Sequence, residues 1–495
     1  MINFRHCSLA VPRRDVLVGL ATSLLATTSC QGRAGQAGNS AQATGRRRPA
    51  HPLSRFGVDR FSNRDQWARL KLAFAAAHDG GFDLEGDPDA QYHHDGPLSL
   101  DGVSFDGQGC TLRALSDGPQ VLRCIGRNFR IANLRILGAA SARTSDNWDN
   151  GIWIGDEGGQ SASEFVLDNV TVDAVSPGRG VAAAGFMFND AHHGRIIRPV
   201  VRRSFADGIH ITNGSSDLVF DRPLSESTGD DGFAVVSYVR QKRICRNIRA
   251  IDGISRDSAA RGFTVVGGVD VVYERPQIER SAAAGLYLYG EGAFDTFGVE
   301  RCQVIAPVIR NCVTGRNLPT GFGQAAITIG GREGEDLVEG QHVTRGAADC
   351  VVHDPVVEGV GPACYAAVAM HQFAIRPRIT GAKLINIAAA NAATRPNGIE
   401  IGGRDVIVEN PQMTNIAGVA IVLNRTASGQ CQVTAPMVSG SRLAGGPVDS
   451  IIYVENASAL TNMVVRGGRF SRGPKRLSIS LVPAGKLHLE DNQIR

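Results

Sequence analysis

The sequence predicts an all-β fold, a right-handed parallel β-helix closed at its N-terminal end by one helix. Two observations lead to this prediction. A short motif of a small residue, an apolar residue, an outward residue and a second apolar residue recurs along the chain, at intervals of 23 to 34 residues between Gly151 and Gly285. Within the motif the residues alternate with a period of two, which is typical of strands and excludes helical repeats.

Each repeat contains at least two short strands. Strands of this length cannot bury an apolar face alone, so stacked repeats must share one continuous core. A second alternating segment runs into Asn or Pro at 165–169, 218–223, 271–276 and 406–411, and we expect corners there because proline breaks a central ladder. The first motif occurs at Gly151-Ile-Trp-Ile154, Gly185-Phe-Met-Phe188, Gly208-Ile-His-Ile211, Gly232-Phe-Ala-Val235, Gly262-Phe-Thr-Val265, Gly285-Leu-Tyr-Leu288, Ala326-Ile-Thr-Ile329, Gly398-Ile-Glu-Ile401 and Gly418-Val-Ala-Ile421.

The N-terminal residues are predicted to direct the protein out of the cytoplasm. Arg13-Arg14 precedes a short apolar stretch over 16–26, so residues 1–30 resemble a twin-arginine export signal, with Cys30 as a candidate site for a lipid anchor. Residues 31–60 are predicted to form a disordered linker, and 61–495 the β-helix domain. We therefore expect a periplasmic or extracellular protein.

One helix is predicted before the repeats. Ser62 and Asp65 are spaced as in a capping box, and the residues that follow place an apolar stripe on one helical face. Such a helix would cover the open end of the core, where strand edges need protection. The apolar stripe consists of Trp67, Leu70, Phe74 and Ala77.

Composition excludes several classes of function. The chain has 495 residues, 43% of them hydrophobic, and a formal net charge of +4 that is spread along the sequence. We therefore expect neither a nucleic-acid partner nor a membrane-spanning segment, and we expect a monomer. Eight cysteines follow the signal without any CxxC spacing, which predicts free thiols in the core and no metal or other cofactor.

Aligning the repeats predicts which side chains meet. Equivalent positions of successive coils stack about 4.8 Å apart. The position before the motif glycine holds Asp207, Asp231 and Arg261 in consecutive coils, with Asp230 beside Asp231. The outward position, two residues after the glycine, holds Trp153, Met187, His210, Ala234, Thr264 and Tyr287.

This acidic cluster has the groups that a glycosidase needs. Carboxylates on neighbouring coils cannot all ionise readily, so at least one of Asp207, Asp230 and Asp231 should have a raised pKa and donate a proton near neutrality. A protonated acid can reach the leaving oxygen while ionised partners hold a water or attack the sugar. The competing interpretation is that Asp-Gly pairs are corner residues, since both residue types favour turns.

The stretch from Asp207 to Ser237, DGIHITNGSSDLVFDRPLSESTGDDGFAVVS, resembles the central motifs of the polygalacturonase family of β-helix glycoside hydrolases, and 96–113 resembles the opening coils of pectin-acting β-helix proteins. The resemblance implies an inverting hydrolysis, with Asp230 as general acid and with Asp207 and Asp231 positioning the attacking water. Tyr287 and Tyr289 stand where that family has the Arg-x-Lys pair that holds a uronate carboxylate.

Further residues near the acids are predicted to bind substrate. Arg261 could pair with an acidic sugar or with Asp231. Aromatic rings at Trp153, Tyr287 and Tyr289 suit stacking on sugar faces, although Tyr287 could also be an outward aromatic in solvent. The remaining candidates are His193, His210 and Tyr238, with Tyr238 as a possible proton carrier. The histidines near the acids, which include His192, have no diagnostic metal-ligand spacing.

The sequence is compatible with three functions. The leading one is an exported glycoside hydrolase that cleaves a polysaccharide. The second is a lyase or epimerase on a uronate polymer, in which Arg261 or a bound cation neutralises the carboxylate while Tyr238, Tyr287 or His210 moves protons. The third is a β-helix that binds glycan without turnover.

Overall fold

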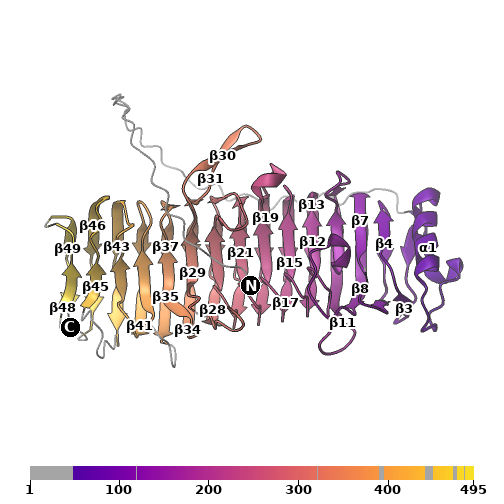
Figure 1. Ribbon diagram of the computed structural model, residues 1–495, viewed down its shortest axis with the longest axis horizontal. Coiled ribbons are helices and arrows are strands. Elements are labelled where there is room, and N and C mark those ends of the chain that lie inside the picture. The colour runs from indigo at the N-terminus through magenta and orange to yellow at the C-terminus, as the bar shows by residue number, and fades with distance from the viewer. Residues whose placement is uncertain are drawn as a thin grey trace. The chain divides into compact units, whose positions relative to one another are not determined.

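The computed structural model describes residues 48–118, 120–319, 321–388, 395–440, 450–471, 476–483 and 485–494. Its strands pair in parallel from coil to coil and follow one another in chain order, apart from the antiparallel hairpin of β30 (Glu335–Val338) and β31 (Gln341–Thr344) (Figure 1). The first face of the coils carries the predicted motif. It consists of β4 (Leu98–Asp101), β7 (Leu122–Arg127), β9 (Ile152–Gly155), β12 (Phe186–Asn189), β15 (Ile209–Thr212), β18 (Phe233–Val236), β21 (Phe263–Val266), β25 (Leu286–Tyr289), β29 (Gln324–Gly330), β35 (Cys364–Met370), β39 (Asn397–Ile401), β42 (Ile421–Leu423), β45 (Ser450–Val454) and β48 (Arg476–Ser480).

Two further faces complete each coil, so the predicted parallel β-helix is confirmed and has three strands per turn over most of its coils. The second face includes β8 (Arg130–Gly138), β11 (Val166–Ala174), β13 (Ala191–Ile197), β16 (Ser216–Asp221), β19 (Arg246–Ile251) and β23 (Val272–Glu274). The third includes β14 (Val200–Arg202), β17 (Leu224–Glu226), β20 (Ile254–Arg256), β24 (Gln277–Glu279), β28 (Val308–Cys312) and β34 (Val356–Val360).

Inward side chains form a stacked core beneath the first face. Phe233 and Phe263, the first residues of β18 and β21, are in register and their rings stack with centroids 5.2 Å apart. Phe220 of the second face meets Phe233 edge-on at 5.0 Å. All three rings are buried, and this close packing fixes the spacing of the coils that carry the acids. All eight cysteines from Cys110 to Cys431 are buried and free, as predicted.

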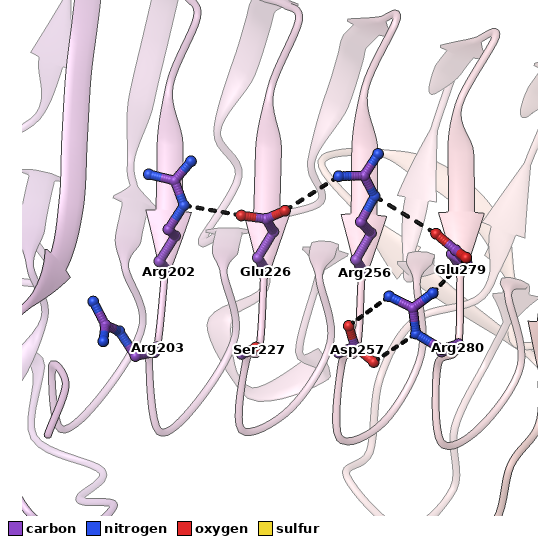
Figure 2. Close-up of a pocket in the computed structure, with 8 residues that line it drawn as sticks. All are labelled: Arg202, Arg203, Glu226, Ser227, Arg256, Asp257, Glu279 and Arg280. Atoms are coloured by element: carbon purple, nitrogen blue, oxygen red, sulfur yellow. Dashed lines mark hydrogen bonds and ion pairs between the residues drawn. The ribbon is translucent and has the colours of Figure 1, made fainter. Parts of the chain in front are cut away.

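The corners hold single residues in the left-handed region, and many of them pair with the next coil. Asp257 and Arg280 have φ of 54° and are joined by a salt bridge of 2.8 Å. Figure 2 shows this pair beside a row of alternating charges on the third face, in which Glu226 lies between Arg202 and Arg256. The corners expected at the Asn residues are present at Asn169 and Asn410, with φ of 56° and 52°, and Asp and Arg also occur at corners because their side chains pair between coils.

The register of the first face agrees with the predicted alignment from Ile152 to Leu286. It differs near the C-terminus, where Ile421 pairs with Ile399, so that Ala420 and not Gly418 corresponds to Gly398. A slip of two residues leaves the inward and outward side chains unchanged, which is why the alternation alone could not detect it.

The helix α1 (Trp67–Gly80) lies at the N-terminal end of the coils (Figure 1) and buries Leu70, Phe74 and Ala77 of the predicted stripe. Phe74 packs on Phe105 of β5 (Phe105–Asp106) with ring centroids 5.8 Å apart. The predicted capping box does not form. Gln66 is the N-cap residue instead, because hydrogen bonds to Asp59 and His93 fix it at the start of the helix.

The ordered domain begins earlier than predicted. Residues 48–60, assigned above to a disordered linker, contain β1 (Ala50–Pro52), which pairs with β2 (Asp83–Glu85), and a 3-10 helix over Leu53–Phe56. Leu53 and Val58 join the core, and their burial stabilises this segment. The predicted signal, with Cys30, lies outside the described residues. Among the described helices none is long and apolar enough to cross a bilayer.

Candidate active site

A pocket of about 410 Å³ opens on the outer side of the first face, over β12, β15 and β18. All three predicted acids line it, together with His210, as the aligned repeats predicted. One wall comes from residues 143–147, in the loop before β9. The opposite wall comes from Tyr238 with the 3-10 helix Val239–Gln241, and from residues 291–296 after β25.

Glycines bring these coils into close contact. A Cβ atom on Gly208 would lie 2.5 Å from the carbonyl oxygen of Gly232 in the next coil, and one on Gly232 would lie 2.0 Å from Ser255 Oγ. Only a residue without a side chain fits at such positions. Each glycine therefore fixes the aspartate that precedes it, Asp207 or Asp231, at the edge of the face.

Asp207 and Asp231 are held by the backbone of the following coil. Asp231 N–H donates to Asp207 Oδ1 at 2.9 Å, and Arg261 N–H donates to Asp231 Oδ1 at 2.8 Å. Asn150 also precedes a motif glycine, and the set of these positions in successive coils is here called the column. Asn150 Oδ1 accepts from Ala184 N–H at 2.8 Å in the same way. The second oxygen of each aspartate has other partners: His210 Nδ1 for Asp207, and Thr264 Oγ1 at 3.1 Å for Asp231.

Asp230 is the most accessible of the three acids. Its side chain is 30% exposed, against 14% for Asp207 and 6% for Asp231. Arg143 Nη1 lies 2.8 Å from Asp230 Oδ2 and is the cation paired with it. Asp230 thus has fewer hydrogen-bond donors around its carboxyl group than its two neighbours, which suits a group that must carry a proton.

Arg261 connects the acids to the next part of the face. Its guanidinium pairs with Asp231 Oδ2 at 3.4 Å and with Glu291, and it lies over the Tyr287 ring with 4.3 Å to the centroid. The interpretation of Arg261 as a partner of Asp231 is therefore confirmed. Because both of its carboxylate partners are largely buried, this arginine compensates charge that would otherwise be costly to bury.

The electrostatics favour a shared proton in the cluster. Burial and the nearby Asp207 raise the pKa of Asp230, while Arg143 lowers it. Burial, opposed by Arg261 and reinforced by the other two acids, raises the pKa of Asp231 to about 8. Because both pKa values are raised, Asp230 and Asp231 share a proton near neutral pH, and Asp230 is the group that can offer it to a substrate because it is the more exposed of the two.

The same three carboxylates are the group of possible metal ligands within the described residues. One oxygen from each of Asp207, Asp230 and Asp231 lies within 4.8 Å of the others. Arg143 and Arg261 already pair with two of the three. The cluster therefore needs no cation to balance its charge, and we assign no metal to it.

Two predicted substrate-binding residues do not reach the pocket. Trp153 is 3% exposed because Trp148 covers it, with ring centroids 5.3 Å apart, and Arg123 lies over both rings. His193 lies on β13 of the second face, where it is exposed and 3.7 Å from Asp217. Its neighbour His192 pairs with Asp190 at 2.8 Å, so these histidines do not join the acids.

The predicted tyrosines have different surroundings. Tyr238 lines the pocket under Arg240, and burial with the charge of Asp207 raises its pKa to about 12, so it stays protonated and is a poor base. Tyr287 is buried beneath Arg261, contrary to the prediction that it offers a ring to sugar. Tyr289 is half-buried and stacks on Tyr287 with 4.9 Å between centroids.

Several pocket residues were missed by sequence reasoning. Arg143, Glu291 and Phe294 lie on loops between strands, where no periodicity indicates which way a side chain points. Phe294 is 61% exposed at the rim and presents an open aromatic face. Trp148, whose ring covers Trp153, is partly exposed but does not line the pocket.

A second hollow, drawn in Figure 2, lies on the third face and is not a candidate for catalysis. Its charged side chains pair with one another: Arg256 lies 3.3 Å from Glu226 and 3.7 Å from Glu279, and Arg280 pairs with Asp257. These contacts satisfy the charges between coils and leave no convergent acid and base.

Comparisons with known proteins agree with this geometry. Residues 118–281 match the family model described as α-1,3-glucanase catalytic domain D2. The catalytic unit of a thermostable GH87 α-1,3-glucanase from Streptomyces thermodiastaticus strain HF3-3 is 15% identical, with a TM-score of 0.50 over 85% of this chain and 68% of that chain. Tailspike protein 3 of Bacteriophage CBA120 is 9% identical, with a TM-score of 0.51 over 90% of this chain and 61% of that chain. No curated protein sequence matches.

Asp207, Asp230 and Asp231 all fall inside the matched segment, as do Arg143 and Arg261. The likeness to the solved structures supports the fold. The predictions of a parallel β-helix and of a glycoside hydrolase are both confirmed. The chain is a parallel β-helix protein and a glycoside hydrolase, whose residues 118–281 are similar to a glycoside hydrolase catalytic domain.

Proposed function

We propose that the protein is an exported glycoside hydrolase that cleaves an α-1,3-linked glucan, with Asp207, Asp230 and Asp231 as its catalytic groups. The observation that carries the proposal is the match of residues 118–281 to an α-1,3-glucanase catalytic domain, because this segment encloses all three acids of the pocket. An extracellular polymer as substrate would agree with the twin-arginine motif at Arg13-Arg14 and with the proposed periplasmic or extracellular location.

The surroundings of the acids favour a neutral sugar over a uronate. Tyr287 and Tyr289 replace the basic pair that would hold a uronate carboxylate. The two arginines beside the acids are paired, Arg143 with Asp230 and Arg261 with Asp231 and Glu291. A second carboxylate, brought by the substrate, would have to compete with these carboxylates for the two arginines.

The proposed reaction uses the unequal environments of the acids. Asp230, accessible and with a raised pKa, gives its proton to the glycosidic oxygen as the bond to the anomeric carbon breaks. Asp207 and Asp231, which line the pocket, hold the attacking water, and one of them takes its proton as the water attacks. His210 and Thr264 keep these two carboxylates in position.

The anomeric form of the first product tests the proposed stereochemistry of hydrolysis. The family resemblance implies inversion, whereas one oxygen of each acid lies within 4.8 Å of the others, closer than the roughly 6.5–9.5 Å usual for inverting pairs. We expect the water to be held within the acid cluster and the first product of an α-linked glucan to be the β anomer. Proton NMR of the earliest product distinguishes the anomers, and an α anomer would show retention.

The test of function is a substrate panel. The full-length protein is incubated with α-1,3-glucan, α-1,4-glucan and polygalacturonate, and new reducing ends are followed beside ultraviolet absorbance. We expect reducing ends from α-1,3-glucan alone. Absorbance from polygalacturonate would indicate a lyase, and binding of glucan without new reducing ends would indicate a binding protein.

A further inference from the structure

The outer side of the first face continues beyond the pocket as a row of aromatic rings. Tyr289, at the end of β25, meets His371 edge-on with 5.8 Å between centroids. His371 follows β35, and its ring lies near that of Tyr365, whose hydroxyl hydrogen-bonds His371 Nε2. The coils that carry these residues lie roughly 10 and 19 Å along the face from the coil of Asp231, two and four coils on at about 4.8 Å each, and the side chains of Tyr289 and His371 meet between them.

Small residues under the rings allow them to lie against the sheet. Tyr365 packs on Ala325, Ala366 and Ala369, all of them fully buried. At Gly330, between Tyr289 and His371, a Cβ atom would lie 2.7 Å from His371 Cβ and 2.9 Å from Tyr289 Cε2. The local sequence thus leaves room for this aromatic row, and the three rings remain half-buried with part of their surface open.

Polar groups lie directly beside the aromatic row. Glu400 of β39 is paired in register with Ala369, which lies under Tyr365. Asn424 Nδ2 donates to Glu400 Oε1 at 3.2 Å, so the second carboxylate oxygen can accept from another group. Both side chains are partly exposed. A sugar ring has an apolar face and a rim of hydroxyl groups. An aromatic ring can contact the apolar face while a carboxylate at its edge accepts hydrogen bonds from the hydroxyl groups.

We propose that Tyr289, His371, Tyr365 and Glu400 form a second sugar-binding site, the distal platform, which binds a more remote unit of the same polysaccharide chain that occupies the pocket. This inference rests on the proposed function and extends it. Its support is the continuity of the face: Arg261 contacts the pocket acids and Tyr287, Tyr287 stacks on Tyr289, and Tyr289 contacts His371. A chain lying along the coils would reach both sites.

The distal platform predicts that affinity depends on chain length. Short oligosaccharides would fill the pocket alone, and longer ones would gain contacts with Tyr289, His371 and Tyr365. Because both sites would bind one molecule, the second contact is made at high effective concentration and increases the affinity of long chains selectively.

The test measures binding without turnover. In an Asp230→Asn background, calorimetry follows the binding of α-1,3-linked gluco-oligosaccharides of increasing length. We expect Tyr365→Ala, added to this background, to weaken binding of the longest oligosaccharides by about tenfold, equal to about 1.4 kcal/mol. Binding of the shortest ones should change little.

Two further variants sharpen the test. His371→Ala should give the same loss, and it replaces Tyr365→Ala if that variant fails to fold. Phe61→Ala removes an exposed aromatic ring near α1, away from the platform, and should bind all lengths like the background protein. Equal affinity for long chains with and without Tyr365 and His371 would overturn the platform while leaving the proposed function intact. No binding at any length would overturn both.

Discussion

At the scale of single residues, Asp207 and Asp231 each make a structural contact with the next coil and also line the pocket. One oxygen of each accepts a backbone N–H from the next coil, as the amide oxygen of Asn150 does in the same column. The other oxygen contacts His210 in Asp207 and Thr264 in Asp231, and both aspartates line the pocket. An aspartate in this column is therefore a structural residue and a functional one together, and its two roles can be separated by substitution.

We predict that Asp207→Asn and Asp207→Ala both lose activity but differ in stability. Asparagine keeps an acceptor for Asp231 N–H, whereas alanine leaves this largely buried donor without a partner, which costs about 1–3 kcal/mol. Urea unfolding of the two variants measures the difference. Equal free energies of unfolding would show that the backbone contact contributes nothing.

The raised pKa of Asp230 also predicts how stability depends on pH. A carboxyl group whose pKa is higher in the folded state stabilises the fold while protonated, and this contribution is lost as the pH rises through the folded-state pKa. Removing the charge with Asp230→Asn should therefore raise the melting temperature by roughly 2 °C at pH 8 and leave it nearly unchanged at pH 4. A lower melting temperature at pH 8 would contradict the raised pKa.

Arg143 is predicted to set the pH range of activity. The pKa of Asp230 is lowered by Arg143 and Arg261 and raised by Asp207, and Asp231 beside it shares its proton. Arg143→Ala removes one cation, so the pKa of the general acid should rise and the alkaline limb of kcat/KM should move to higher pH. Arg240→Ala, in the opposite wall, is the matched control. An alkaline limb that stays in place or moves to lower pH would remove Arg143 from this role.

At the scale of the elements, the strands were predictable and the loops were not. Alternation placed Asp207, Asp231 and His210 on one face in the correct register, because a period of two determines which side of a strand each residue occupies. Arg143 and Phe294 lie on loops whose course depends on packing between coils. Trp153 shows the limit within strands, since its position was right but Trp148 from the preceding loop covers it.

The tight stacking of the coils under the acids gives a prediction for the motif glycines. Gly208→Ala would place a Cβ atom 2.5 Å from the backbone oxygen of Gly232, so the coils must separate, at a cost of about 1–3 kcal/mol. Activity should fall with it, since Asp207 and Asp231 flank this contact. Gly158→Ala, where the nearest atom would be 3.7 Å away, is the control. Wild-type melting in Gly208→Ala would contradict the close contact.

At the scale of the whole domain, one face carries the pocket acids and the aromatic row, while the other faces supply packing and paired charges. Corner pairs such as Asp257 with Arg280 lie in solvent, where single ion pairs contribute up to about 1 kcal/mol. Stability therefore rests mainly on the continuous core. Because stability comes from the core, the first face can carry buried acids whose ionisation destabilises the fold.

The central claim is that three aspartates on adjacent coils form one hydrolytic centre. Its most direct test is the rate of reducing-end formation from α-1,3-glucan by the wild type, Asp230→Asn and Asp231→Asn, with melting curves recorded on the same samples. We predict that both variants fold and lose turnover by at least about 10²-fold, the contribution of a general acid or base. Folded variants that keep wild-type turnover would contradict the account.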